Sequence, residues 1–160
     1  MAIDIIEICT KYGDRLYAAA FNITRQRQDA EDAVQEALLR LYRTGKEFES
    51  EEHVKAWLIR VTINIAKSTC TSFWHRNRVP YEDYMEEIPF EDDSDRDLME
   101  AVLSLPDKYR IIVHLHYYEG YKTREIADTL KLSENTVKTR LLQSRKLLKT
   151  KLEGWQDEDI

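Results

Sequence analysis

The stretch that most constrains the fold is VPYEDYMEEIPFEDDSDRD, residues 79–97. It holds two of the three prolines of the chain and few aliphatic side chains, and residues 79–104 carry ten acids against one Arg. A segment with such dense like charge repels itself and cannot bury enough apolar surface to form a core. We therefore predict a flexible acidic linker at 79–97 that divides the 160-residue chain into two small domains.

Both domains are predicted to be helical, which makes the fold all-α. The chain has only four Gly and three Pro, too few to supply the turns of a sheet protein. Before the linker, apolar residues at 5, 9, 12, 16, 19 and 23 mark one helix. A second is expected to begin at Asp29 as its N-cap and a third at about Ser50. The expected domains are 1–78 and 98–153, with an acidic tail at 154–160.

The second domain carries a helix-turn-helix pattern, a motif that binds duplex DNA. Pro106 is expected to open a helix over Asp107 to Tyr118, with Gly120 ending it. Thr123 is expected to cap a short helix, and after the turn KLS, Ser133 caps a last helix over residues 133–152. This last helix holds six Lys or Arg and one acid in a chain of net charge −6.

The two faces of this basic helix differ in chemistry. Steps of about 100° per residue place Val137, Leu141, Ser144 and Leu148 inward. The opposite side can enter a major groove, because Asn and Gln bind adenine edges while Thr and Leu contact the thymine methyl. That side consists of Asn135, Thr139, Leu142, Gln143 and Lys146, with Lys138, Arg140 and Arg145 at flanks that suit phosphates. The alternative for the helix as a whole is a basic surface that only contacts solvent. For the exposed Leu142, three alternatives stay open: a contact with DNA, a contact with a partner protein, or no contact.

A second basic region, residues 54–78, has five Lys or Arg and no acid. On the third helix, Arg60, Asn64 and Lys67 share the outer side. An aromatic run, residues 73–75 (Phe73, Trp74 and His75), follows. Aromatic rings among cations suit single-stranded nucleic acid, whose bases stack while Lys and Arg follow the backbone. The alternative places Trp57 and Phe73 in the core.

Several other classes of protein are not expected. Cys9 and Cys70 have no metal-site spacing and are predicted to be buried free thiols. His114 and His116 lie two apart on a helix and cannot share a ligand. With no Gly-rich loop or nucleophile arrangement, we expect no enzyme, cofactor or metal. No apolar run reaches the length of a membrane span and no signal peptide begins the chain, so a cytoplasmic protein is expected.

Three blocks, in order, resemble the small extracytoplasmic-function (ECF) sigma factors of bacterial RNA polymerase. DAEDAVQEALLRLYR (29–43) is similar to the helix that binds the coiled coil of the largest polymerase subunit. KAWLIRVTINIAKS (55–68) is similar to the helix that engages the minus-ten promoter element, and the preceding loop TGKEFESEEH (44–53) is similar to the loop that captures a flipped base. LPDKYRIIVHLHYYEGYKTREIADTLKLSENTVKTRLLQSRKLL (105–148) is similar to the region that reads the minus-thirty-five element.

The resemblance implies a transcription initiation factor that binds core RNA polymerase, directs it to two-part promoters and captures the melted nontemplate strand. By position, it assigns the melted strand to Phe48, Arg60, Asn64 and Lys67. It assigns the minus-thirty-five duplex to Asn135, Thr136, Lys138, Thr139, Arg140, Leu142, Gln143 and Arg145. It assigns core polymerase to Asp29, Asp32, Gln35, Glu36 and Arg40. An anti-sigma factor is a further implied partner.

This chain departs from the family pattern at three places. Lys131 stands where many relatives have a glycine, so the turn takes another shape or holds a lysine in the left-handed conformation. The loop 44–53 is acidic, with Glu47, Glu49, Glu51 and Glu52, and Gln143 stands where relatives often have Arg. In the linker, Glu91, Asp92, Asp93 and Asp95 resemble the family segment that threads the RNA channel.

The rival function is a helix-turn-helix regulator that binds duplex DNA without polymerase.

Overall fold

The computed structural model describes residues 2–70 and 93–152. For residues 93–96 it describes the backbone only. All regular structure in these ranges is helical, which confirms the predicted all-α class for the described part of the chain. The chain divides into two units, Met1–Val79 and Pro80–Ile160. The aromatic run 73–75, most of the predicted linker and the acidic tail lie outside the described residues.

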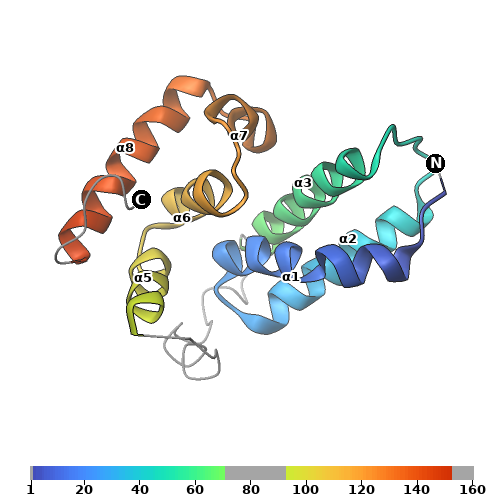
Figure 1. The fold of residues 1–160 in the computed structure, drawn as a ribbon, viewed down its shortest axis with the longest axis horizontal. Helices are drawn as coiled ribbons and strands as arrows, with labels where there is room; N and C mark the ends of the chain where they lie inside the picture. Colours follow the sequence, from blue (N-terminus) through green and yellow to red (C-terminus); the bar gives the residue numbers. More distant parts are fainter. Residues whose placement is uncertain (1, 71–92, 153–160) are drawn as a thin grey trace. The chain divides into compact units, whose positions relative to one another are not determined.

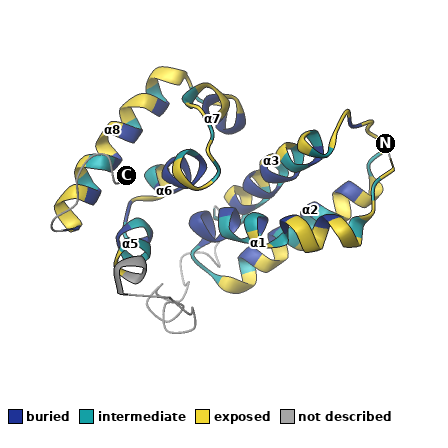
Figure 2. Cartoon of the chain, in the orientation of Figure 1, coloured by how far each residue is buried: buried dark blue, intermediate teal, exposed yellow. Residues whose placement is uncertain are grey.

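The N-terminal unit is a bundle of three helices that pack pairwise against one another (Figure 1). They are α1 (Ile5–Thr24), α2 (Arg27–Arg43) and α3 (Glu51–Cys70). Asp4 caps α1, because its Oδ1 accepts the backbone N–H groups of Ile6 at 3.0 Å and Glu7 at 3.3 Å. The buried sides of the three helices face each other (Figure 2), so the bundle has one continuous apolar interior.

Two predictions for this unit are wrong in detail. Helix α2 begins at Arg27 with Gln26 at the N-cap, so Asp29 lies in the first turn, where its charge still favours the helix dipole. The core stripe of α1 passes through Ile8 rather than Cys9, which is exposed. Cys70 is half-buried and its thiol donates to the Ile23 carbonyl at 3.3 Å. The thiols are therefore free, as predicted, but neither is buried.

The C-terminal unit consists of short helices gathered on one long one. They are α5 (Asp93–Leu103), α6 (Asp107–Val113), α7 (Thr123–Leu130) and α8 (Glu134–Lys151), with a π-helical turn η2 (His114–Tyr118) between α6 and α7. Helix α8 packs on α5, α6 and α7. Part of the core consists of Ala101, Leu105, Val113, Leu148 and Leu152, against which Leu98, Val102, Tyr109 and Leu147 pack.

The element boundaries of this unit differ from the prediction at three points. Helix α5 begins at Asp93, inside the predicted linker, and acidic residues are favourable in the first turn of a helix. The helix that follows Pro106 changes from α to π geometry after Val113. Lys122, not Thr123, is the N-cap of α7, where its N–H donates to the Glu125 carboxylate at 3.0 Å. Gly120 has φ 75°, as expected of a residue that ends a helix.

A fully buried cation, Arg110, holds the turn between α5 and α6. Its Nη1 donates to the Leu105 carbonyl at 2.8 Å, and its Nη2 lies 2.6 Å from the Asp107 carboxylate. Both contacts satisfy a charge that would otherwise be costly to bury. The start of α6 is thereby fixed relative to the end of α5.

Candidate nucleic-acid interfaces

The turn between α7 and α8 sets the direction of the basic helix. Lys131 ends α7 in the left-handed conformation, with φ 58° and ψ 46°, which decides between the two shapes that the sequence allowed. Ser133 is the N-cap of α8, as predicted, and its Oγ accepts the Thr136 N–H at 3.1 Å. Thr123 joins the two helices, because its hydroxyl donates to the Glu134 carboxylate at 2.9 Å. The helix-turn-helix geometry is therefore held on both sides of the turn.

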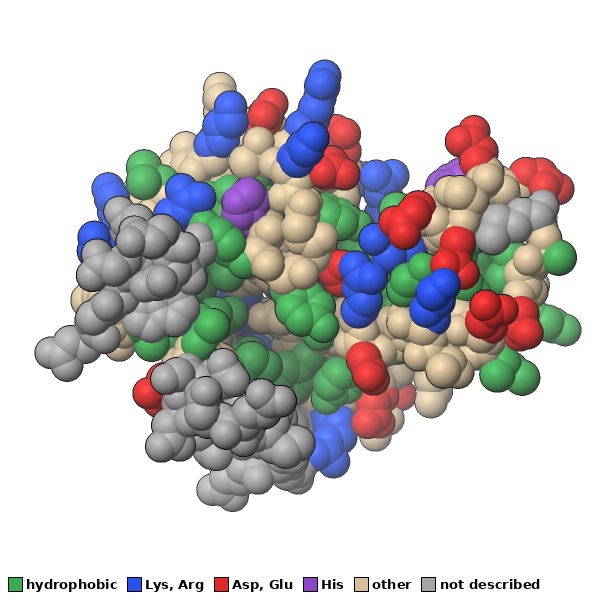
Figure 3. Space-filling view, viewed as in Figure 1, with side chains coloured by type: hydrophobic (Ala, Val, Ile, Leu, Met, Phe, Trp, Pro, Cys, Tyr) green, Lys and Arg blue, Asp and Glu red, His purple; other side chains and the backbone are tan. Residues whose placement is uncertain are grey.

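The predicted division of α8 into two faces is confirmed by burial. The four inward positions, Val137, Leu141, Ser144 and Leu148, are buried. The outward positions are exposed: Asn135, Thr139, Leu142, Gln143 and Lys146. Lys138 is exposed as well, while Thr136, Arg140 and Arg145 are half-buried. Lys and Arg side chains project along α7 and α8 (Figure 3), and the outward face is thus a polar, cationic surface of the kind that suits a major groove.

Arg145 has a partner that the sequence analysis missed. Its Nε–H donates to the Tyr117 hydroxyl at 2.6 Å, and its guanidinium lies 5.8 Å from the centre of the Tyr117 ring. Tyr117 belongs to the π-helical turn, which helical periodicity alone does not predict. Leu142, Lys146 and Lys149 line a surface hollow beside Arg145. A guanidinium held at Nε keeps its two terminal nitrogens for a phosphate.

On α3, the three residues expected to contact a melted strand are exposed on one side of the helix. They are Arg60, Asn64 and Lys67. The opposite side is buried in the bundle through Leu58, Ile59, Thr62, Ile63 and Ala66. The outer side of α3 therefore presents two cations and an amide, as the helical spacing predicted.

The loop before α3 turns its aromatic residue inward. Phe48 is only 5% exposed, and its ring meets those of His53 and Trp57 edge-on, with centroids 5.1 Å and 5.6 Å away. His53 Nδ1 accepts the Glu49 N–H at 3.1 Å, so the imidazole carries its proton on Nε2 when neutral. Ser50 Oγ accepts the His53 N–H at 3.2 Å. Phe48, assigned by resemblance to the strand, is placed here as an anchor of the loop.

The acids Glu51 and Glu52 of this loop form contacts within the protein. Glu51 accepts from Tyr12 at 2.9 Å and from Lys11 at 2.5 Å, and Glu52 pairs with Lys55 at 3.0 Å. The Lys11 and Tyr12 hydrogen bonds hold the pKa of Glu51 below its usual range. The hydrogen bond to Glu51 also raises the pKa of Lys11. The pKa of Tyr12 is raised mainly by burial and, second, by its hydrogen bond to Glu51. Part of the acidity that departs from the family pattern thus has a structural role.

The face of α2 assigned to polymerase is a polar surface with an apolar centre. Asp32, Gln35 and Arg40 are exposed, while Asp29 and Glu36 are half-buried. Asp32 accepts from Gln28 at 2.8 Å, and Arg40 donates to Glu36 at 3.2 Å. Leu39, 45% exposed, lies between these residues by helical angle. The sequence analysis did not name Leu39, because a single apolar residue on a charged helical face carries no signal by itself.

Neither a metal centre nor a membrane span is found in the described part of the chain. No group of His, Cys, Asp or Glu side chains within it is arranged to hold an ion. None of its helices combines the length and the apolar composition that crossing a bilayer requires.

Two family models match the chain, one in each unit. Residues 8–78 match "Sigma-70 region 2" and residues 95–148 match "Sigma-70, region 4". The matched ranges hold most of α1, all of α2 and α3, most of α5, all of α6 and α7, and most of α8. Both candidate interfaces therefore lie inside matched regions.

Similar proteins span nearly the same length as this chain. RNA polymerase sigma factor SigV of Bacillus subtilis is 29% identical over 154 residues, which cover 92% of this chain and 90% of that protein. ECF RNA polymerase sigma factor SigL of Mycobacterium tuberculosis is 30% identical over 146 residues, covering 86% and 82%. The solved sigma factor RpoE of Bartonella quintana, crystallised with the anti-sigma factor NepR, has the same fold, with a TM-score of 0.71, 20% identity and coverage of 92% and 96%.

Proposed function

Because this chain belongs to the ECF family of RNA polymerase sigma factors, we propose that its two exposed basic helices bind one promoter at two places. Helix α8 enters the major groove of the minus-thirty-five element. The outer side of α3 and the loop before it hold the melted nontemplate strand at the minus-ten element. The observation that carries this proposal is the outward face of α8, whose polar side chains are exposed while its four inward positions are buried.

Each side chain has a distinct role at the minus-thirty-five element. Asn135 and Gln143 read base edges with their amides, and Thr136, Thr139 and Leu142 contact thymine methyl groups. Lys138, Arg140 and Arg145 bind phosphates, which fix the register without reading the sequence. Because the Nε–H of Arg145 donates to the Tyr117 hydroxyl, Arg145 presents its two terminal nitrogens to the phosphate.

At the minus-ten element, Arg60 and Lys67 follow the strand backbone and Asn64 binds a base edge. The loop contributes its exposed backbone and side chains, with Phe48 holding its shape from inside. Unstacking a base costs a few kcal/mol, which these contacts offset. Phe48 therefore contributes to strand capture through the loop conformation.

The α2 face binds core polymerase through Asp29, Asp32, Gln35, Glu36 and Arg40, around the exposed side chain of Leu39. Sigma factors are transcription initiation factors without catalytic chemistry of their own, and we infer no enzymatic activity for this chain. Its partners, polymerase and chromosome, place it in the cytoplasm. An anti-sigma factor is a further partner, by analogy with the RpoE and NepR complex.

The rival function, a regulator that binds duplex DNA without polymerase, is not supported. Such a protein would need no counterpart of region 2, yet residues 8–78 match that region. Region 2 and region 4 together, in this order and over nearly the full length of SigV and SigL, are the organisation of a sigma factor.

The test is run-off transcription from linear genomic fragments with purified core polymerase, with and without the protein. Discrete new start sites that depend on the protein are expected, and their upstream sequences supply both promoter elements. Transcripts that are unchanged by the protein, while the protein alone shifts duplex DNA, would contradict the proposal.

A further inference from the structure

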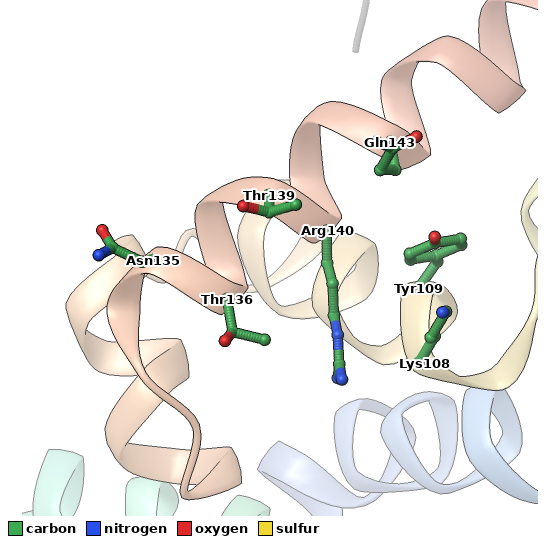
Figure 4. A pocket seen from close by; sticks show the side chains of 7 residues that line it. All are labelled: Lys108, Tyr109, Asn135, Thr136, Thr139, Arg140 and Gln143. Atoms are coloured by element: carbon green, nitrogen blue, oxygen red, sulfur yellow. The ribbon is translucent and has the colours of Figure 1, made fainter.

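One flank of α8 forms a hollow with α6, and nothing above assigns a role to the α6 residues that line it. It is lined by Asn135, Thr136, Thr139, Arg140 and Gln143 from α8 and by Lys108 and Tyr109 from α6. Figure 4 shows Arg140 extending from α8 on the same side as Lys108 and Tyr109. Tyr109 is half-buried and packs against the core cluster that includes Leu105 and Leu148, which holds α6 against α8. The hollow thus has two walls from different helices of one unit.

The charge of this hollow has a single sign. Two cations line it and no carboxylate does. The carboxylates nearest in sequence are engaged elsewhere, because Asp107 pairs with Arg110 at 2.6 Å and Glu134 accepts from Thr123 and lies 3.6 Å from Lys138. The cations of the hollow therefore lack an acidic counterpart within its walls.

The two cations of the lining are also available to a ligand. Arg140 is half-buried, yet no described residue forms a hydrogen bond or ion pair with its guanidinium. The Lys108 ammonium lies 5.1 Å from the centre of the Tyr109 ring and has no carboxylate partner among the described residues. A planar guanidinium, an ammonium and a phenol in one hollow are a set of donors that matches a phosphate.

We propose that this hollow binds a backbone phosphate of the duplex, with Lys108 and Tyr109 of α6 as contacts outside the helix-turn-helix. This inference rests on the proposed function and extends it. Arg140 binds the phosphate through its terminal nitrogens, Lys108 acts as a point charge, and the Tyr109 hydroxyl donates a hydrogen bond. Arg145 lies on the other side of α8, so phosphates on both strands that border the major groove are held, one by each flank.

The experiment measures the affinity of the holoenzyme for a duplex that carries the minus-thirty-five element found by run-off transcription. A series of duplexes replaces one phosphate at a time by an uncharged methylphosphonate. One position is expected to weaken wild-type binding about three- to fivefold. Lys108→Gln and Arg140→Gln are each expected to weaken binding to the unmodified duplex by a similar factor and to abolish the effect of that position. Each variant should also reduce the salt slope of log K by about 0.9.

Lys151→Gln is the matched control, because it removes the same charge from α8 outside the hollow and should leave the methylphosphonate profile unchanged. The inference is overturned if the variants and the wild type lose affinity equally at every position. It is also overturned if the variants weaken polymerase binding while the salt slope stays constant, which would assign the hollow to an acidic protein surface.

A failure of the proposed function is distinguishable from a failure of this inference. If no promoter is found, the full chain is titrated alone with a short duplex of mixed sequence at several salt concentrations. A smaller salt slope for Lys108→Gln than for Lys151→Gln would still support the phosphate site. Equal slopes for the two variants would reject it.

Discussion

The turn before α8 and the loop before α3 each lead into a helix that we propose to bind nucleic acid, but they are held in different ways. The turn is three residues long and depends on backbone conformation and capping: a left-handed Lys131, a Ser133 cap and one side-chain bond between α7 and α8. The loop is anchored by a buried aromatic ring and by a carboxylate bonded to α1. A short capped turn suits a helix that itself reads a rigid duplex, whereas a separately anchored loop suits a flexible single strand.

The largest effect is expected from breaking the aromatic anchor. Phe48→Ala removes a ring that is 5% exposed and should destabilise the N-terminal unit by about 3 kcal/mol. The measurement is urea unfolding followed by fluorescence of Trp57, which contacts Phe48, in a background where Trp74 and Trp155 are replaced by Phe. Tyr42→Ala is the control, because Tyr42 is 75% exposed. Equal losses for Phe48→Ala and Tyr42→Ala would refute the anchor.

The two capping serines allow the turn and the loop to be compared by the same substitution. Ser133 Oγ accepts the Thr136 N–H at 3.1 Å, and Ser50 Oγ accepts the His53 N–H at 3.2 Å. Ser133→Ala and Ser50→Ala should each cost about 1 kcal/mol of local stability, measured by amide hydrogen exchange of α8 and α3. Only Ser133→Ala should weaken binding to the minus-thirty-five duplex. Weaker duplex binding for both variants would mean that the two interfaces are not separate.

A smaller effect, of opposite sign, is expected at Lys131. A left-handed lysine costs about 1 to 2 kcal/mol, part of which is offset in Lys131→Gly by the greater freedom of glycine in the unfolded chain. The variant should stabilise α7 and α8 by about 0.5 to 1 kcal/mol in hydrogen exchange. Lys131→Ala keeps the left-handed strain and should give no gain. A gain of the same size from both would point to the loss of the lysine charge instead.

The sequence predicted best where one physical rule decides the structure. The faces of α8 and α3 follow from helical periodicity, and the cap at Ser133 follows from a hydroxyl acceptor at the start of a helix. It failed where two rules compete. Ile8 replaces Cys9 in the core because both lie near the same helical face, and the longer apolar side chain fills the interior.

Contacts between residues far apart in the sequence were beyond prediction. The bond between Tyr117 and Arg145 spans 28 residues and depends on a π-helical turn. The hollow between α6 and α8 depends on how closely those helices pack. Phe48 was assigned by resemblance alone, which gives a residue a position in the family pattern but not a direction for its side chain. Such features follow from packing, which a helical wheel does not contain.

The carboxylate anchor of the loop should show itself in the pH dependence of stability. Because the pKa of Glu51 is held below its usual range by Lys11 and Tyr12, its contribution is present above the pKa of the unfolded chain and is lost as the pH falls through the folded value. Glu51→Gln should lower Tm of the N-terminal unit at pH 7, and the difference from wild type should shrink between about pH 5 and pH 3. Thermal scans followed by Trp57 fluorescence measure this difference.

Lys11→Gln is the matched variant for that pH series, because it removes one of the two donors to Glu51. In the Lys11→Gln background, the pH-dependent part of the Tm loss caused by Glu51→Gln should be smaller. A Tm difference that stays constant from pH 7 to pH 3 would mean that Glu51 acts through packing rather than charge. In that case the loop would be held by its aromatic ring alone. The loop would then differ from the turn before α8 in that burial holds the loop whereas backbone conformation holds the turn, and charge would play no part in the difference.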